Sequence, residues 1–229
     1  MPYCRNCGKE VGETEKFCPD CGAQIIGKAV KIPAEAPKYG AQTGVMETLS
    51  KGVNIISAKP MVLVPALLGA VISAVLSVLS IGGAYGILLN LIGAIISYVL
   101  GFASLDMSRN AYLNRELNLS KSIQYVIERI GTFIVASIVG ALLAITIILA
   151  PVAILMFVVI VVDETGIVKA ASRAFQVLGA RLVPIIIILV ISGAAGIILG
   201  MIPFVGSILV AAFNVLIALA FIDIYYGAR

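Results

Sequence analysis

Six apolar runs occupy most of the chain after residue 60. They cover residues 61–80, 85–105, 131–149, 151–162, 183–200 and 204–222. A transmembrane helix needs about 20 predominantly apolar residues, and the run at 151–162 is clearly shorter than that. The pattern predicts an all-α polytopic membrane protein with six spans. Its third and fourth spans form a tight hairpin around Pro151, which either thins the bilayer locally or stops short of crossing it.

The charged residues between these runs decide the number of passes. Every Lys and Arg lies before residue 60, within 106–130, within 163–181, or at Arg229. The connections between paired runs carry no charge. Six passes place all the basic segments on one side, as the excess of Lys and Arg in cytosolic loops requires, whereas five passes would put 163–181 outside. We therefore expect both termini in the cytosol, with the protein in the cytoplasmic membrane of a prokaryote.

The segments that precede the first, third and fifth runs share a second pattern. Each has a serine followed by a base, an amide, and a second base eight residues after the first: Ser50, Lys51, Asn54 and Lys59; Ser120, Lys121, Gln124 and Arg129; Ser172, Arg173, Gln176 and Arg181. Apolar residues recur at i, i+4 and i+7, which form one stripe of a helix. We predict three amphipathic elbow helices, at 47–59, 119–130 and 166–181, along the cytosolic interface.

The even-numbered spans also end alike, with two apolar residues followed by Asp106, Asp163 or Asp223. The predicted unit is thus an elbow helix and a transmembrane hairpin, repeated three times. A carboxylate at a helix C-terminus opposes the helix dipole, so we expect each aspartate to pair with an elbow base. Within the spans, Asn90 and Asn214 are expected to form hydrogen bonds between helices. Rows of small residues at four-residue spacing are expected to pack helices closely.

Composition agrees with a membrane location. The chain is 61% hydrophobic and only 12% charged, with a mean hydropathy of +1.10. A water-soluble protein is usually about 25% charged. Histidine is absent from the sequence, which removes the commonest general base and any imidazole metal ligand.

The N-terminal segment carries the one cluster of metal-binding residue types. Cys4 and Cys7 form one Cys-x-x-Cys-Gly knuckle, and Cys18 and Cys21 form another. Because the segment lacks the features of a signal peptide, we expect these thiols in the cytosol, where disulfides are rare. Four thiolates complete a tetrahedral shell that suits one structural zinc ion and leaves no site for a catalytic water. A disulfide pair and a rubredoxin-like iron site are the alternatives.

These residues suggest a division into a zinc ribbon at 1–24, a flexible linker at 25–46 and a six-span membrane domain at 47–229. The two knuckles resemble the short zinc ribbons at the N-termini of many prokaryotic membrane and regulatory proteins. The elbow-and-hairpin layout, with Pro60, Pro65 and the segment 202–206, is similar to the membrane domain of some glycerophosphodiester phosphodiesterases. The phosphodiesterase domain itself is absent from this sequence, so the resemblance does not imply that activity.

We predict a membrane scaffold or adaptor that is not an enzyme, because the sequence shows no acid–base pair and no cysteine outside the knuckles. The ribbon would contact a cytosolic protein partner, and the body would contact membrane lipids. A homo-oligomer is a further candidate assembly. Nucleic acid is disfavoured because the acidic and basic residues of the ribbon cancel.

The alternative function is a transporter of lipid or apolar cargo, or a membrane-remodelling protein. A cavity that reaches from Asn90 or Asn214 to the elbows would favour this alternative, and a close-packed body would favour the adaptor.

Overall fold

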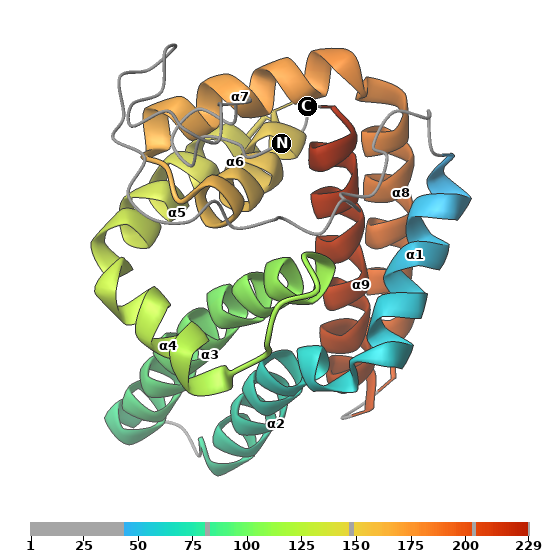
Figure 1. Ribbon diagram of the computed structural model, residues 1–229. Helices are drawn as coiled ribbons and strands as arrows, with labels where there is room; N and C mark the ends of the chain where they lie inside the picture. Colours follow the sequence, from blue (N-terminus) through green and yellow to red (C-terminus); the bar gives the residue numbers. More distant parts are fainter. Residues whose placement is uncertain (1–43, 81–82, 147–148, 203–204, 229) are drawn as a thin grey trace, which may run out of the picture. The chain divides into compact units, whose positions relative to one another are not determined.

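The computed structural model describes residues 44–80, 83–146, 149–202 and 205–228, and these are helical almost throughout (Figure 1). The chain divides into two compact units at residues 41 and 42, and the described residues belong to the second. The predicted ribbon at 1–24 and nearly all of the predicted linker lie outside them. The helices are α1 (Val45–Ala58), η1 (Pro60–Leu63, a 3₁₀ turn), α2 (Val64–Leu79), α3 (Gly83–Tyr112), α4 (Leu119–Glu128), α5 (Ile130–Ala144), α6 (Ala150–Asp163), α7 (Ile167–Ala180), α8 (Leu182–Gly200) and α9 (Val205–Gly227).

Four helical segments are long and apolar enough to cross a membrane. They are η1 with α2, then α3, α8 and α9. Two further pairs, α4 with α5 and α6 with α7, pass the same test only when each bent pair is taken as one span, so the described residues contain four to six candidate spans. The prediction is therefore confirmed for an all-helical arrangement of the described residues with several helices able to span a membrane.

The third and fourth predicted spans correspond to short helices. α5 has 15 residues and α6 has 14, which gives each a length of only about 21–22 Å against a hydrocarbon core of about 30 Å. Nine of the 14 residues of α6 are buried, whereas α8 buries only two of 19. Such a short apolar run is typical of a helix in a protein core. The other helices of the protein cover α6, whereas α8 leaves an apolar surface that is suited to contact with lipid.

The bends that separate the predicted elbows from the spans have local causes. The axes of α4 and α5 differ by 74°, and those of α6 and α7 by 119°. Glu164 ends α6 in the left-handed conformation with φ of 51°, and Arg129 leaves helical geometry between α4 and α5. Asn118 caps α4, because its side chain accepts a hydrogen bond from the backbone N–H of Lys121.

α1 packs along the C-terminal half of α9 in antiparallel fashion (Figure 1). Thr48 contacts Asp223, and one turn later Gly52 lies against Leu216 and Leu219. A methyl group on Gly52 would lie 2.6 Å from a methyl carbon of Leu216, so the glycine permits the close approach. The position of α1, α4 and α7 along a membrane interface stays a prediction.

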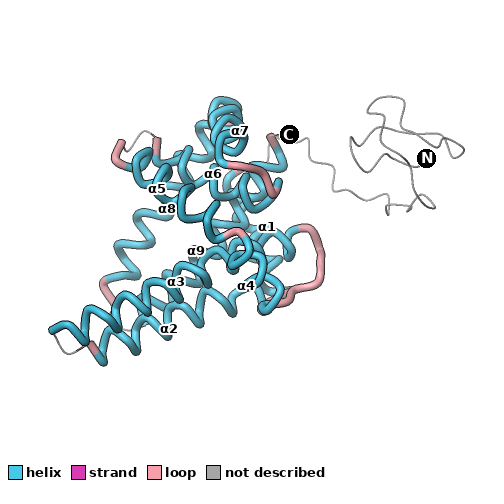
Figure 2. The backbone as a smooth tube through the Cα atoms, turned by 90° about the vertical axis from the view of Figure 1, so that its left-hand side faces the viewer, coloured by secondary structure: helices cyan, strands magenta, loops and turns pink. Residues whose placement is uncertain are grey.

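The remaining long helices form two hairpins. α2 and α3 lie side by side, as both views show, and α8 pairs with α9 (Figures 1 and 2). α9 contacts α2 and α3 as well as α6, so it joins the α2–α3 hairpin to the buried core around α6. The ends of α3, α6 and α9 that carry the three aspartates meet in this region.

Candidate functional site: buried aspartates and a hydroxyl-lined cavity

Asp223, near the end of α9, is buried, and both of its carboxylate oxygens have hydrogen-bond partners. Its two carboxylate oxygens accept hydrogen bonds from the Thr48 hydroxyl at 2.9 Å and the Tyr112 hydroxyl at 2.8 Å. The Lys51 ammonium lies 3.6 Å away and supplies the compensating charge. The elbow base predicted for this aspartate is therefore confirmed, and the site also joins α1 and α3 to α9.

Asp163 at the end of α6 has equivalent partners. Arg173 of α7 forms an ion pair with it, and the hydroxyl of Tyr225 of α9 donates a hydrogen bond to it. Arg173 occupies the same position in its elbow as Lys51 does in α1. The predicted pairing with an elbow base is confirmed here too.

Asp106 of α3 departs from the prediction. Its cation is Arg109 of the same helix, at 2.9 Å, and the elbow helix α4 contributes the Ser122 hydroxyl at 2.7 Å instead of a base. Arg109 also donates to the backbone oxygen of Val161 at 2.6 Å and to Glu164 at 2.9 Å. The buried Arg109 side chain thus links α3 to the end of α6 and also neutralises the charge of Asp106. The repeated pattern of the elbow segments did not predict this double role.

These contacts give the three aspartates structural roles. Each carboxylate lies in the C-terminal part of its helix, is buried, and is held by donors from another segment as well as by a cation. Asp163 is the last residue of α6, whereas α3 continues for six residues beyond Asp106. A buried charge without a partner costs several kcal/mol. The ion pairs are therefore needed for the C-terminal parts of α3, α6 and α9 to pack together.

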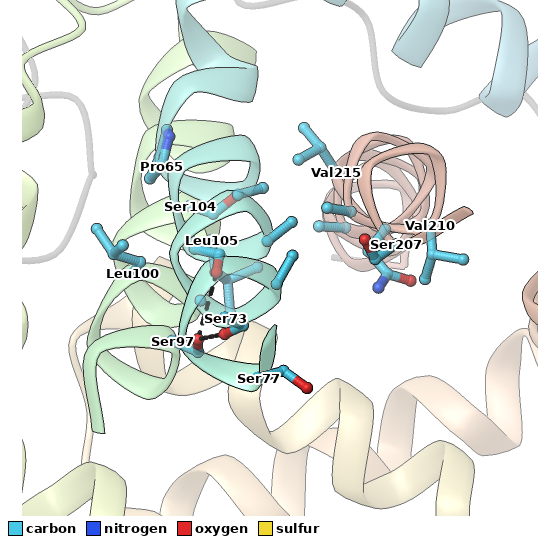
Figure 3. A pocket seen from close by; sticks show the side chains of 18 of the residues that line it. Pro65, Ser73, Ser77, Ser97, Leu100, Ser104, Leu105, Ser207, Val210 and Val215 are labelled. Atoms are coloured by element: carbon cyan, nitrogen blue, oxygen red, sulfur yellow. Dashed lines mark hydrogen bonds between the residues drawn. The ribbon is translucent and has the colours of Figure 1, made fainter. Parts of the chain in front are cut away.

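A cavity of about 670 Å³ lies between α2, α3 and α9 (Figure 3). It extends from Pro65, just after α1 and η1, to Ser77 and Val78 at the other end of α2. Its polar lining residues are Ser73, Ser77, Ser97, Ser104, Ser207 and Asn214. Figure 3 shows the serine side chains of α2 and α3 on one side of the space and α9 on the other.

A second cavity of about 440 Å³ adjoins the first between α3, α6, α8 and α9. Its lining is richer in aromatic residues, among them Tyr98, Phe102, Phe157 and Phe221. Both cavities are lined by Ser97, Gly101, Leu105, Asn214 and Ala218. The described residues that line the two cavities include no Asp, Glu, Lys or Arg, so an occupant meets hydroxyl, amide and apolar groups there.

The two span asparagines differ in role. Asn90 donates to the Ser80 hydroxyl at 2.7 Å and to the Gly86 carbonyl at 3.0 Å, so it links the end of α2 to α3 as predicted. Asn214 is exposed and lines both cavities, and within the described residues its side chain has no hydrogen-bond partner. The prediction of an inter-helix bond was wrong for Asn214.

Sequence reasoning also missed the serines that line the first cavity. The signal was present, because Ser73 and Ser77 lie one turn apart on α2, and Ser97, Gly101 and Ser104 lie on one face of α3. Gly101 belongs, with Gly93 and Ser97, to one of the rows of small residues that were expected to pack helices closely. A methyl group on Gly101 would nevertheless meet no atom of the described residues within 4 Å. By contrast, Gly93 and Gly140 do pack closely, against Leu76 and Phe157.

A family model of the zinc-ribbon domain matches residues 3–25, which contain all four cysteines. The chain is therefore a protein with an N-terminal zinc-ribbon domain followed by helices able to cross a membrane. No curated protein and no solved structure matches the chain. The resemblance to the membrane domain of glycerophosphodiester phosphodiesterases consequently has no support.

Proposed function

We propose that the membrane body binds a lipid-like amphiphile in the cavity between α2, α3 and α9. The observation that carries this proposal is the cavity itself, which reaches from Pro65 beside η1 to Asn214 at the middle of α9. A cavity from Asn214 to the elbows was expected of cargo handling, and a close-packed body of a pure adaptor. The cavity includes Asn214 and ends at Pro65, and its lining contains no residue of the three predicted elbows, so it meets the first expectation in part. A volume of about 670 Å³ lies within the range of small-molecule sites.

Gly101 offers a direct test. Gly101 lines both cavities, and a Cβ added there meets no described atom within 4 Å. Gly101→Leu therefore places an apolar side chain in the space that the ligand would occupy. Gly196→Leu in α8 is the matched control, because a Cβ there also meets no described atom and the residue lines neither cavity. We expect purified wild type and Gly196→Leu to retain a lipid-like molecule in stoichiometric amount, and Gly101→Leu to lose most of it. Equal retention by all three proteins would refute the proposal.

The zinc ribbon is proposed as the cytosolic contact module of the same protein. The match of a zinc-ribbon model to residues 3–25 supports this role, and Cys4, Cys7, Cys18 and Cys21 are the ligands we propose for one structural zinc ion. Four thiolates are a donor set that suits zinc, and the metal would supply folding free energy to a segment too short for a core of its own. The adaptor role thus belongs to the ribbon and the amphiphile site to the body.

The threefold repeat is retained as a proposal about the membrane body. Its support is the cyclic order of the aspartate contacts: Ser122 of the second elbow reaches Asp106, Arg173 of the third reaches Asp163, and Thr48 of the first reaches Asp223. Each elbow thus contacts the aspartate of the preceding hairpin, with the first contacting the last. Equivalent positions of the three elbows, Gly52, Ser122 and Ala174, are also buried.

A further inference from the structure

Three polar groups of the first cavity are without a protein partner. The hydroxyls of Ser77 and Ser104 and the amide of Asn214 make no hydrogen bond within the described residues. Ser73 and Ser97 differ from them, because their hydroxyls bond to each other across α2 and α3 (Figure 3). In an apolar environment an unpaired amide or hydroxyl is costly, so these groups call for an occupant that can hydrogen-bond.

The depth of Asn214 limits what that occupant can be. It precedes Asp223 by nine residues, which corresponds to about 14 Å along α9. With Asp223 taken as the cytosolic end of the span, as the charge pattern predicts, this distance places the amide near the middle of a hydrocarbon core of about 30 Å. At that depth a membrane phospholipid presents only acyl chain, which has no group for an amide to bond.

Charge limits the occupant further. A phosphate or carboxylate drawn to the level of Asn214 would be buried without a cation, because no Lys or Arg is among the described residues that line either cavity. The adjoining aromatic cavity, which includes Phe102, Phe157 and Phe221, can hold an apolar chain or ring. The two cavities together therefore fit a molecule with a neutral hydrogen-bonding part and a large apolar part.

We infer that the site selects uncharged, phosphate-free amphiphiles such as neutral glycerolipids, and that Asn214 recognises their hydroxyl or carbonyl group. This inference rests on the proposed function, since it names the ligand class of the same cavity. Asn214 contacts the ligand directly, while Ser77 and Ser104 supply further hydrogen bonds along the path.

The absence of tryptophan from the sequence allows a selective probe. Val78→Trp places a single indole at the cavity lining, and Val190→Trp in α8 is the control outside both linings, since these valines are 63% and 65% exposed. In nanodiscs, diacylglycerol with brominated acyl chains quenches an indole that it contacts. Phosphatidylglycerol with the same chains differs only in its charged headgroup.

In the Val78→Trp variant we expect saturable quenching by brominated diacylglycerol at low mole fraction and a weaker, linear response to brominated phosphatidylglycerol. The Val190→Trp variant should respond linearly and equally to both lipids. In the Val78→Trp background, Asn214→Leu should weaken diacylglycerol binding about tenfold, as the loss of one hydrogen bond to the ligand implies, while Asn214→Gln keeps an amide and most of the affinity. Gly101→Leu in the same background should abolish the saturable phase.

The outcomes separate the two proposals. Saturable binding of phosphatidylglycerol with equal affinity, or an unchanged affinity in Asn214→Leu, overturns the neutral-ligand inference while the cavity remains a binding site. A linear response of the Val78→Trp variant to both lipids, equal to that after Gly101→Leu, overturns the proposed function as well. A third outcome is that the Val78→Trp variant shows no saturable quenching and that Gly101→Leu changes the oligomeric mass. This outcome would show that a second copy of the chain covers the cavity and that both proposals are wrong.

Discussion

The residues that hold the helix ends together are polar, although most of the chain is apolar. Asp223 accepts hydrogen bonds from α1 and α3, Asp163 accepts one from α9, and Asp106 accepts one from α4. Each of these bonds joins segments that are distant in sequence or separated by a loop. In a body whose apolar faces resemble lipid, hydrogen bonds of this kind specify which helices meet.

Asp223→Asn should destabilise the membrane body by about 1.5–3 kcal/mol, because hydrogen bonds to a charged acceptor are worth that much and the new amide nitrogen would face a donor hydroxyl. Both carboxylate oxygens now accept, one from Thr48 and one from Tyr112. The measurement is unfolding in mild detergent. Glu116→Gln is the control, since its side chain is 81% exposed and 3.9 Å from Lys121, and it should change stability little. Equal stability of the two variants would contradict the structural role of Asp223.

At the scale of elements, the helices divide into two hairpins with exposed apolar surfaces, α2–α3 and α8–α9, and one buried helix, α6. α8 buries only two of its 19 residues and α6 buries nine of its 14, although both helices are predominantly apolar. Hydropathy alone does not separate these cases, because an apolar residue is compatible with lipid and with a protein core. Length separates them, since 14 residues are too few to cross a bilayer unaided.

The α8–α9 hairpin depends on a glycine at its turn. A methyl group on Gly206 would overlap the backbone carbonyl oxygen of Leu199, which cannot move without opening the hairpin. Gly206→Ala should therefore cost about 1–3 kcal/mol. Gly193→Ala in α8 meets no described atom within 4 Å and should be neutral or stabilising by up to about 1 kcal/mol. Thermal unfolding of both variants in the same detergent checks the difference, and a larger loss in Gly193→Ala would contradict the packing described.

Much of the helical fold could be predicted from the sequence, because apolar runs, Pro65, Pro151 and the charged connections mark the helices and their ends. The roles of single polar residues could not. Asn90 and Asn214 look alike in sequence, and only the arrangement of helices gives one a partner and leaves the other in a cavity. The hydrogen bond from Arg109 to the backbone oxygen of Val161 in α6 likewise cannot be predicted from the sequence, because it depends on how α3 and α6 pack.

At the scale of the whole molecule, a zinc-ribbon domain at residues 3–25 precedes a helical body with four to six candidate membrane spans, and the chain divides into two units between residues 41 and 42. This division is compatible with the two proposed roles, a contact role for the ribbon and a ligand site in the helical body. Zinc would stabilise the ribbon alone, because all four cysteines lie within it.

Cys18→Ser/Cys21→Ser should therefore remove about one zinc ion per chain while leaving the unfolding temperature of the membrane body unchanged. Metal analysis and thermal unfolding measure the two effects, and cross-linking in native membranes should show the loss of a cytosolic partner. Asn6→Ser/Gln24→Ser is the control in the same segment, since it keeps the thiols. Retained zinc in the cysteine variant, or an unchanged partner set, would contradict the proposed ligands or the proposed contact role respectively.

The central claim is that the cavity between α2, α3 and α9 holds an amphiphile. The most direct measurement is mass spectrometry of the intact protein released gently from its own membranes, with the bound molecule identified by fragmentation. We predict a stoichiometric adduct that is free of phosphorus, present in wild type and Gly196→Leu and absent in Gly101→Leu. Wild-type protein that carries no adduct, or an adduct that Gly101→Leu retains, would contradict the claim.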